Sequence, residues 1–334
     1  GRSSASPRDD PKHDGVRKHD AQRQRQTAAL AALRSHRDAC ASAGVGGWDL
    51  FERMATLSLS HRTESSQNRC RTCWHDAATG CICGRVPILR KEDLPPRGQL
   101  RVKLTVLMHH KEYLCAGNTA KLLLSMLPNG WAELYVFGRE GDLDSLIEDI
   151  RTDDRLSRRT MTLWPGEEAC TVREFLNDAS SRVSSGLPSV NDDDCGVDKE
   201  YGEGRKNGLT LRVVVLDGTY SNAKHMAKAL RKRLGECAPR NVALHPSSAS
   251  VFRRAQKSYG TAMTKGLRNN SKSASRALRV STAEAVAQLL VELGGKESVR
   301  DSIVAAVMVN NEVLCNHQDE PSESNLKQNP VASL

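Results

Sequence analysis

The stretch from residue 211 to residue 226 limits the possible folds of this chain more than any other part. It reads Leu-Arg-Val-Val-Val-Leu-Asp-Gly-Thr-Tyr-Ser-Asn-Ala-Lys-His-Met, so an apolar, β-branched run ends at Asp217 and a helical pattern follows at once. A short apolar run that leads through Gly into a Ser or Thr helix cap is typical of a buried parallel strand followed by a helix. The sequence therefore predicts an α/β fold organised around a strand that ends at Asp217.

Asp217 is the candidate functional residue of this stretch. In open α/β sheets, ligands bind in the crevice beyond the carboxyl ends of the strands, where Asp217 is expected to lie. The alternative is a purely structural role, in which Asp217 caps the following helix and Thr219 satisfies its first amides. The spacing of the residues leaves both interpretations open.

A cluster of cysteines precedes this stretch, with the spacing Cys70-x2-Cys73-x7-Cys81-x-Cys83. Paired cysteine knuckles can supply the four tetrahedral ligands that zinc requires, and His75 is a spare candidate. Four thiolates leave no open position for a substrate, so the predicted zinc is structural. Free thiols and disulfides are the alternatives. Ten cysteines in 334 residues are too few for a disulfide scaffold, which favours an intracellular, reducing compartment.

The positive charge of the chain is concentrated in residues 221–280. This segment contains fourteen Lys or Arg and one acidic residue, Glu236, which gives it a net charge of +13, against +9 for the whole chain. Solvated helix faces usually mix both signs, so this segment is better explained as a surface for the phosphates of a nucleic acid. No run of 18 apolar residues is present, which predicts no transmembrane helix and no membrane partner.

Four blocks of the sequence occur in the order of a known family's motifs. They are Cys70 to Cys83 (two cysteine knuckles), His109 to Glu112 with Asn118-Thr119 (a His-Pro-x-Glu and Asn-Thr block), Asp217 to Tyr220 (Asp-x-Thr-Trp) and Ser281 to Ala285 (Ser-Thr-x-Glu-Ala). Together they resemble the DTW-domain family. The chain departs from the family pattern at Tyr220, where Trp is usual, and at His110, where Pro is usual.

The resemblance implies a SPOUT-like, knotted parallel sheet flanked by helices, with an N-terminal zinc-binding knuckle. The family comprises tRNA-uridine aminocarboxypropyltransferases that bind S-adenosylmethionine. The implied reaction moves the 3-amino-3-carboxypropyl group to N3 of a uridine and releases 5′-methylthioadenosine. Asp217 is the candidate general base, because the imide nitrogen is a poor nucleophile while it is protonated. We expect the helix N-termini at Asn118 and Ser281 to bind the carboxylate of the donor.

The resemblance also suggests contact residues. Those expected at the cofactor are Asn118, Thr119, Gly138, Arg139, Leu163, Trp164, Pro165, Leu216, Thr219, Tyr220, Ser281 and Thr282. Those expected at tRNA are Lys224, Lys228, Arg231, Arg233, Arg253 and Arg254. Trp164 is compatible with stacking on an adenine and with a place in the core. Two alternative functions are a SPOUT-type RNA methyltransferase and a non-catalytic, zinc-containing RNA-binding protein.

The predicted organisation combines changes in composition along the chain, which give the tails and the insertion, with the family resemblance, which implies the knuckle and the catalytic domain. It comprises a disordered tail (1–26), a helical extension (27–67), the zinc knuckle (68–90), a catalytic domain (91–315) with a polar insertion (184–207), and a flexible tail (316–334). Within the domain, the patterns predict strands at 101–109 and 134–137 and helices at 118–127, 142–155, 220–234 and 299–314. Ser281, with Glu284 three residues later, predicts a capping box at the start of a further helix. His109 and His110 should point in opposite directions from their strand, which makes a shared metal improbable.

Overall fold

The computed structural model describes residues 11–95, 101–155, 159–166, 168–184, 210–244 and 281–316. Within these ranges the strands form one parallel six-stranded sheet with the order β2-β1-β5-β3-β6-β4. The strands are β1 (Arg101–His109), β2 (Ala132–Phe137), β3 (Arg159–Leu163), β4 (Cys170–Thr171), β5 (Thr210–Asp217) and β6 (Arg240–Ala243). The predicted α/β class and the central place of the strand ending at Asp217 are confirmed.

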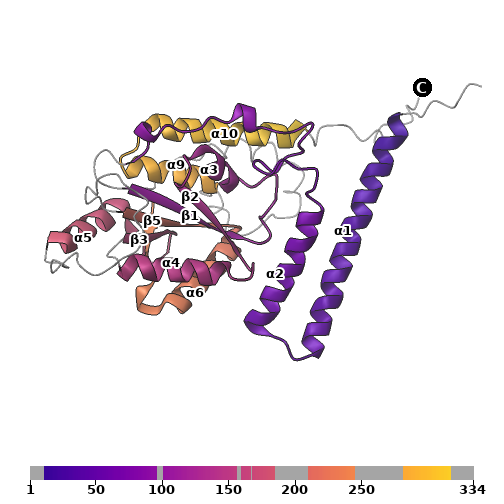
Figure 1. Cartoon of the computed structure of the whole chain (residues 1–334), viewed down its shortest axis with the longest axis horizontal. Coiled ribbons are helices and arrows are strands. Elements are labelled where there is room, and N and C mark those ends of the chain that lie inside the picture. Colours follow the sequence, from indigo (N-terminus) through magenta and orange to yellow (C-terminus); the bar gives the residue numbers. More distant parts are fainter. Residues whose placement is uncertain are drawn as a thin grey trace, which may run out of the picture.

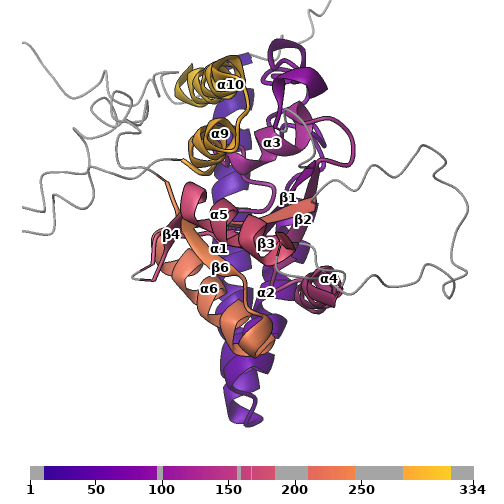
Figure 2. The same cartoon turned by 90° about the vertical axis from the view of Figure 1, so that its left-hand side faces the viewer.

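Helices cover both faces of the sheet (Figure 2). They are α1 (Pro11–Ser42), α2 (Gly47–Glu64), α3 (Ala120–Met126), α4 (Asp142–Arg155), α5 (Val172–Ser184), α6 (Tyr220–Leu234), α9 (Thr282–Glu292) and α10 (Glu297–Asn316), with 3-10 turns η1 (Cys83–Arg85), η2 (Lys91–Asp93) and η3 (Gly235–Cys237). Helices α3, α9 and α10 pack on one face, and α4 and α6 pack on the other. We call these the α9 face and the α6 face.

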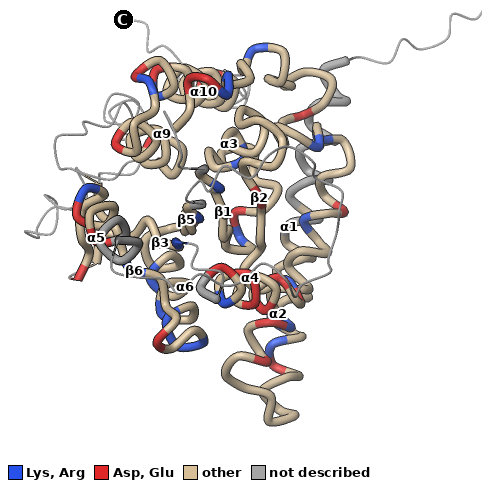
Figure 3. Tube along the Cα trace, turned by 60° about the vertical axis from the view of Figure 1, so that its left-hand side comes forward, with Lys and Arg blue, Asp and Glu red and all other residues tan. Residues whose placement is uncertain are grey.

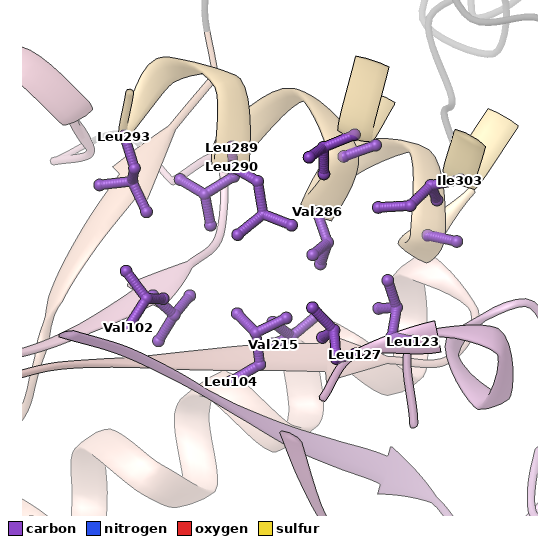
Figure 4. Close-up of a cluster of buried hydrophobic side chains, with 14 of the residues drawn as sticks. Val102, Leu104, Leu123, Leu127, Val215, Val286, Leu289, Leu290, Leu293 and Ile303 are labelled. Carbon is purple, nitrogen blue, oxygen red and sulfur yellow. The ribbon is translucent and has the colours of Figure 1, made fainter. Parts of the chain in front are cut away.

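Strand β5 supplies side chains alternately to the two faces. Val213 and Val215 belong to the hydrophobic core under α9, whereas Val214 and Leu216 belong to the core under α6. Figure 4 shows Val215 beneath the leucines of α9. Because side chains alternate along a strand, Asp217 continues the series of Val213 and Val215 and points to the α9 face. The sequence of β5 thus fixes the side of the sheet on which its terminal carboxylate lies.

The N-terminal hairpin of α1 and α2 lies beside the sheet domain (Figure 1). Helix α1 begins at Pro11, within the segment of residues 1–26 for which the composition predicts disorder. Residues 11–26 contain eight Lys, Arg or Gln, which have high helix propensity, and low hydrophobicity alone did not reveal this. Helix α2 lies within the segment 27–67, for which the sequence predicts a helical extension.

Helix α2 docks at the carboxyl end of β2. The rings of Trp48 and Phe51 contact Phe137, with ring centroids 5.4 and 5.1 Å apart. A Cβ on Gly138 would lie 2.5 Å from the Cβ of Ala55, and the φ of Gly138 is +96°. Only glycine satisfies both conditions, so Gly138 allows the close approach of α2.

Several predicted elements match the structure closely. Helices α4 and α6 have the predicted bounds, as does β1. The capping box of Ser281 and Glu284 is present at the start of α9. The predicted insertion (184–207) lies outside the described residues except for Ser184, and the segment 245–280 lies outside them entirely. Among the described helices, none has the length and apolar character that crossing a membrane requires.

Candidate active site and metal centre

Asp217 is buried at the carboxyl end of β5, with 3% of its surface exposed. Asn118 Nδ2 donates a hydrogen bond of 2.6 Å to Asp217 Oδ2, and the side chain of Thr282 is a second partner. Burial raises the pKa of Asp217 to about 6, although both hydrogen bonds favour the ionised form, and the negative charge of Glu112 adds to the rise. Such a carboxylate is ionised at neutral pH and more basic than an exposed one.

The structure also bears on the alternative role of Asp217 as a helix cap. Helix α6 is capped by Thr219, whose side chain accepts a hydrogen bond from the backbone N–H of Asn222 at 3.4 Å. The partners of Asp217 instead precede α3 and start α9, on the other face of the sheet. The Thr219 cap agrees with one part of the structural alternative, whereas the partners of Asp217 lie away from α6 and do not support a cap by Asp217.

The N-termini of α3 and α9 are joined beside Asp217. Asn118 Oδ1 accepts from the N–H of Lys121 at 3.1 Å, and Thr119 Oγ1 accepts from the N–H of Ala283 at 3.4 Å. The capping box of α9 engages the backbone N–H groups of Ser281 and Glu284. These backbone donors are therefore engaged within the protein.

Four of the predicted cofactor residues gather around Asp217 on the α9 face. They are Asn118, Thr119, Ser281 and Thr282. Trp164 and Tyr220 form a separate pair, stacked with ring centroids 5.2 Å apart at 28°. Trp164 packs with the α6-face core, as Leu216 does, and Pro165 lines a cavity on that side. The predicted set is thus divided between the two faces.

Two further predicted residues lie at the end of β2 and have structural partners there. Gly138 accommodates Ala55 of α2, as described above. Arg139 forms an ion pair with Asp142 in the first turn of α4, with 2.7 Å between Nη2 and Oδ2. Leu163 ends β3 next to Val215 of β5. The cofactor roles of these residues stay predictions.

His109 and His110 lie side by side, with ring centroids 4.3 Å apart. The expectation that they point in opposite directions is wrong, because β1 ends at His109 and the strand alternation does not extend to the next residue. Burial lowers the pKa of His109 to about 3 and that of His110 to about 4, so both are neutral at physiological pH. Within the described ranges, the only group of at least three potential ligands that could hold a metal is the cysteine cluster.

Two residues near the site were not predicted as site residues. Phe51 of α2 contacts the rings of His110 and His225 at centroid distances of 5.5 and 5.7 Å. No local pattern indicates this contact, because α2 is distant in sequence from both histidines. Glu112 acts electrostatically on Asp217, and its place in the His-Pro-x-Glu block was the available signal.

The predicted tRNA-contacting residues of α6 also separate into two groups. Lys224, Lys228 and Arg231 line a cavity of about 470 Å³. Arg233 instead forms an ion pair with Asp144 of α4. Figure 3 shows the concentration of basic residues on α6. Arg253 and Arg254 lie outside the described residues.

The four cysteines of the knuckle are close enough to hold one metal ion. Their sulfur atoms all lie within 4.8 Å of one another, with 3.6 Å between Cys70 and Cys83 and 3.9 Å between Cys73 and Cys81. Zn–S bonds of about 2.3 Å in tetrahedral geometry place sulfur atoms roughly 3.8 Å apart. The donor set and its geometry fit structural zinc.

The surroundings of the cysteines favour a structural role. His75, the spare candidate ligand, is buried, and its Nε2 lies 2.9 Å from Asn310 Oδ1 of α10. Arg85 forms an ion pair of 2.6 Å with Glu312 of the same helix. Backbone hydrogen bonding from Cys73 lowers the pKa of Cys70 to about 6, whereas burial raises the pKa of Cys83. The knuckle thus attaches the start of the domain to its last helix.

Taken together, the chain is a parallel α/β protein with a buried carboxylate at the carboxyl edge of its sheet and a separate cluster of four cysteines that could hold a metal ion. The family model of the DTW domain matches residues 67–318, and the chain belongs to the DTW domain family. This family is associated with tRNA-modifying transferases. Comparisons with curated proteins and with solved structures gave no match.

Proposed function

We propose that this protein transfers the 3-amino-3-carboxypropyl group of S-adenosylmethionine to N3 of a uridine in tRNA and releases 5′-methylthioadenosine. The observation that carries the proposal is the buried Asp217, held by Asn118 and Thr282 with a pKa near 6, within a DTW domain. A residue that only supported the fold would not require an ionisable group at this place, since burying a charge is costly.

Asp217 acts as the general base. It accepts the N3 proton of the uridine as the new N–C bond forms, because the imide nitrogen lacks an available lone pair until that proton leaves. A carboxylate with a pKa near 6 is mostly ionised at pH 7 and accepts a proton more readily than an exposed Asp. Asn118 and Thr282 keep the carboxylate in one orientation through their hydrogen bonds.

The residues around Asp217 suit the amino-acid end of S-adenosylmethionine. The side chains of Asn118, Thr119 and Thr282 offer an amide and two hydroxyls, which can pair with ammonium and carboxylate groups. When bound, S-adenosylmethionine supplies an electrophilic carbon next to its sulfonium. Positioning by the protein must present the γ-carbon rather than the methyl group to the uridine.

The basic segment 221–280 supplies the contact with tRNA through phosphates. Its charge of +13 supports this assignment, and the described part of it includes the exposed cations of α6. The zinc site stabilises the knuckle and takes no part in the transfer, because four thiolates leave the metal no free position.

Mass spectrometry of nucleosides from tRNA incubated with the protein and S-adenosylmethionine tests the proposal. We expect a uridine that carries the aminocarboxypropyl group, together with free 5′-methylthioadenosine. A methylated nucleoside would instead identify a SPOUT-type methyltransferase. An unchanged tRNA, with no cofactor binding by calorimetry, would identify a non-catalytic RNA-binding protein.

A further inference from the structure

A cavity of about 470 Å³ lies on the α6 face, between helix α6 and the turn that follows β3. Its walls include Trp164, Pro165 and Gly166 of the turn, and Asn241 of β6. Helix α6 contributes Ala227 and Leu230 as well as its cations, and both apolar residues belong to the α6-face core. Asp217 and its partners lie on the α9 face. The cavity is therefore distinct from the candidate reaction site.

The cavity is positively charged along one side. Lys224, Lys228 and Arg231 line it at the spacing i, i+4, i+7, which places them on one side of a helix. Glu168 also lines it and lies 3.6 Å from Arg231, at positions where both side chains are mostly exposed. In the part of the chain that the structure describes, neither Lys224 nor Lys228 forms an ion pair with a carboxylate. The lining therefore has two cations in excess of its acid.

The rim of the cavity is aromatic. Tyr220 stacks on Trp164 and is still 53% exposed, so its ring is accessible to a further planar group. Gly166 keeps the neighbouring wall open, since a Cβ there would lie 3.3 Å from Asn241 Nδ2 and 3.5 Å from Trp164 Cδ1. The cavity thus combines a stacking surface, an amide side chain, an apolar floor and excess positive charge.

We propose that this cavity binds one nucleotide of the RNA, away from the uridine that reacts. The base stacks on Tyr220, as bases do on aromatic side chains in single-stranded RNA sites, and the phosphates lie against Lys224, Lys228 and Arg231. The proposal rests on RNA being the partner in the proposed function. It assigns the Trp164–Tyr220 pair to the RNA rather than to the cofactor.

The charge of the cavity favours a nucleotide over S-adenosylmethionine. The sulfonium carries a positive charge and the molecule has no phosphate, so an excess of cations repels its reacting end. A nucleotide brings at least one negative charge together with a planar base, and both find partners in the lining. A free nucleotide and a nucleotide within an RNA chain present the same base and phosphate to the cavity. The experiment is therefore designed to distinguish these two ligands.

Equilibrium binding of a fluorescent tRNA to the full chain, without S-adenosylmethionine, tests this inference independently of catalysis. Lys228→Glu is compared with Lys232→Glu, which makes the same charge change on α6 at an exposed position outside the cavity lining. Tyr220→Leu is compared with Tyr220→Phe, which keeps the ring. We expect Lys228→Glu to weaken binding several-fold more than Lys232→Glu does. Tyr220→Leu should weaken it roughly 5- to 100-fold, with Tyr220→Phe close to the unaltered chain.

A second arm uses uridine 5′-monophosphate and uridine as competitors. If the cavity accepts a free nucleotide, the monophosphate displaces tRNA at lower concentration than uridine, and Lys228→Glu removes this difference. If the cavity accepts only an RNA chain, neither uridine 5′-monophosphate nor uridine displaces tRNA. The order of the tRNA affinities of the variants is then still the one given above. Equal losses from Lys228→Glu and Lys232→Glu, or a Tyr220→Leu protein that binds normally, would overturn the inference. Absence of tRNA binding by the unaltered chain would instead overturn RNA as the partner in the proposed function.

Discussion

Asn118 Nδ2 lies 2.6 Å from Asp217 Oδ2, although the two residues are 99 positions apart in the chain. The contact joins the loop before α3 to the end of the central strand, and Thr282 at the start of α9 completes the arrangement. Three separate segments thus determine the environment of one carboxylate. A chemical role for Asp217 explains why three segments of the chain meet at its carboxylate. This role and the burial of Asp217 lead to the first two predictions.

Asp217→Asn should reduce transfer about 10²- to 10⁴-fold while binding of tRNA and S-adenosylmethionine is retained. Asn preserves the shape of the side chain and can still accept a hydrogen bond from Asn118, but it cannot accept the N3 proton. Single-turnover rates and calorimetry measure the two effects separately. Turnover near that of the unaltered protein would show that Asp217 is not the base.

The same substitution should stabilise the protein at neutral pH. Burial raises the pKa of Asp217 from 3.8 to about 6, so the folded state disfavours the ionised carboxylate. The cost is full above pH about 6 and vanishes below pH about 4, where both states are protonated. A rise of about two pKa units corresponds to about 3 kcal/mol. Urea unfolding at pH 8 and pH 4 should show Asp217→Asn to be more stable only at the higher pH.

One zinc ion per chain is expected at Cys70, Cys73, Cys81 and Cys83. Cys73→Ser should abolish stoichiometric zinc and lower the melting temperature, because the knuckle is attached to α10 through His75 and Arg85. Cys237→Ser is the matched control, since Cys237 is an exposed free cysteine outside the cluster. Elemental analysis and thermal unfolding provide the two measurements. Protein purified without chelators that contains no metal would contradict the assignment.

Charge reversal at Arg253 and Arg254 should weaken tRNA binding and reduce its salt dependence. Binding releases fewer counterions when a phosphate contact is lost. The magnitude of the slope of log affinity against log salt should therefore decrease by roughly 0.7 to 0.9 per contact. Binding isotherms at several salt concentrations measure this slope. An unchanged slope would place the phosphate contacts on other residues.

Gly138→Ala should destabilise the protein more than Gly130→Ala. Both glycines have positive φ, so both substitutions introduce backbone strain, of about 1 kcal/mol. Only at Gly138 would the added Cβ meet another side chain, that of Ala55, whereas nothing lies within 4 Å at Gly130. The difference between the two melting temperatures therefore reports the contact with α2. Equal shifts in melting temperature would mean that α2 moves away from the added Cβ with no loss of stability.

The features that the sequence predicted well depend on neighbouring residues. The run that forms β5, the capping box at Ser281 and the four-cysteine cluster each consist of a local pattern that determines a local geometry. The residues near Asp217 were identified through the family resemblance, whereas the contact with Asn118 required the fold to bring distant segments together. Local patterns carry no information about such contacts.

Gly138 shows why other interpretations could not be settled from sequence. A Gly-Arg turn after a strand is compatible with an anion site. In the structure, however, Gly138 allows the close approach of Ala55 in α2, 83 residues earlier in the chain, and Arg139 pairs with Asp142. Similarly, the lysines of α6 look alike in sequence. Only the position of the turn after β3 distinguishes Lys228, which lines the cavity, from Lys232, which does not.

The docking of α2 has a consequence for where this protein can be divided. The DTW match begins at residue 67, but Phe51, which precedes it, packs against Phe137 and His110. A protein shortened to the matched region would present these rings to water next to the carboxyl edge of the sheet. We therefore expect a minimal active fragment to include α2 in addition to the matched region.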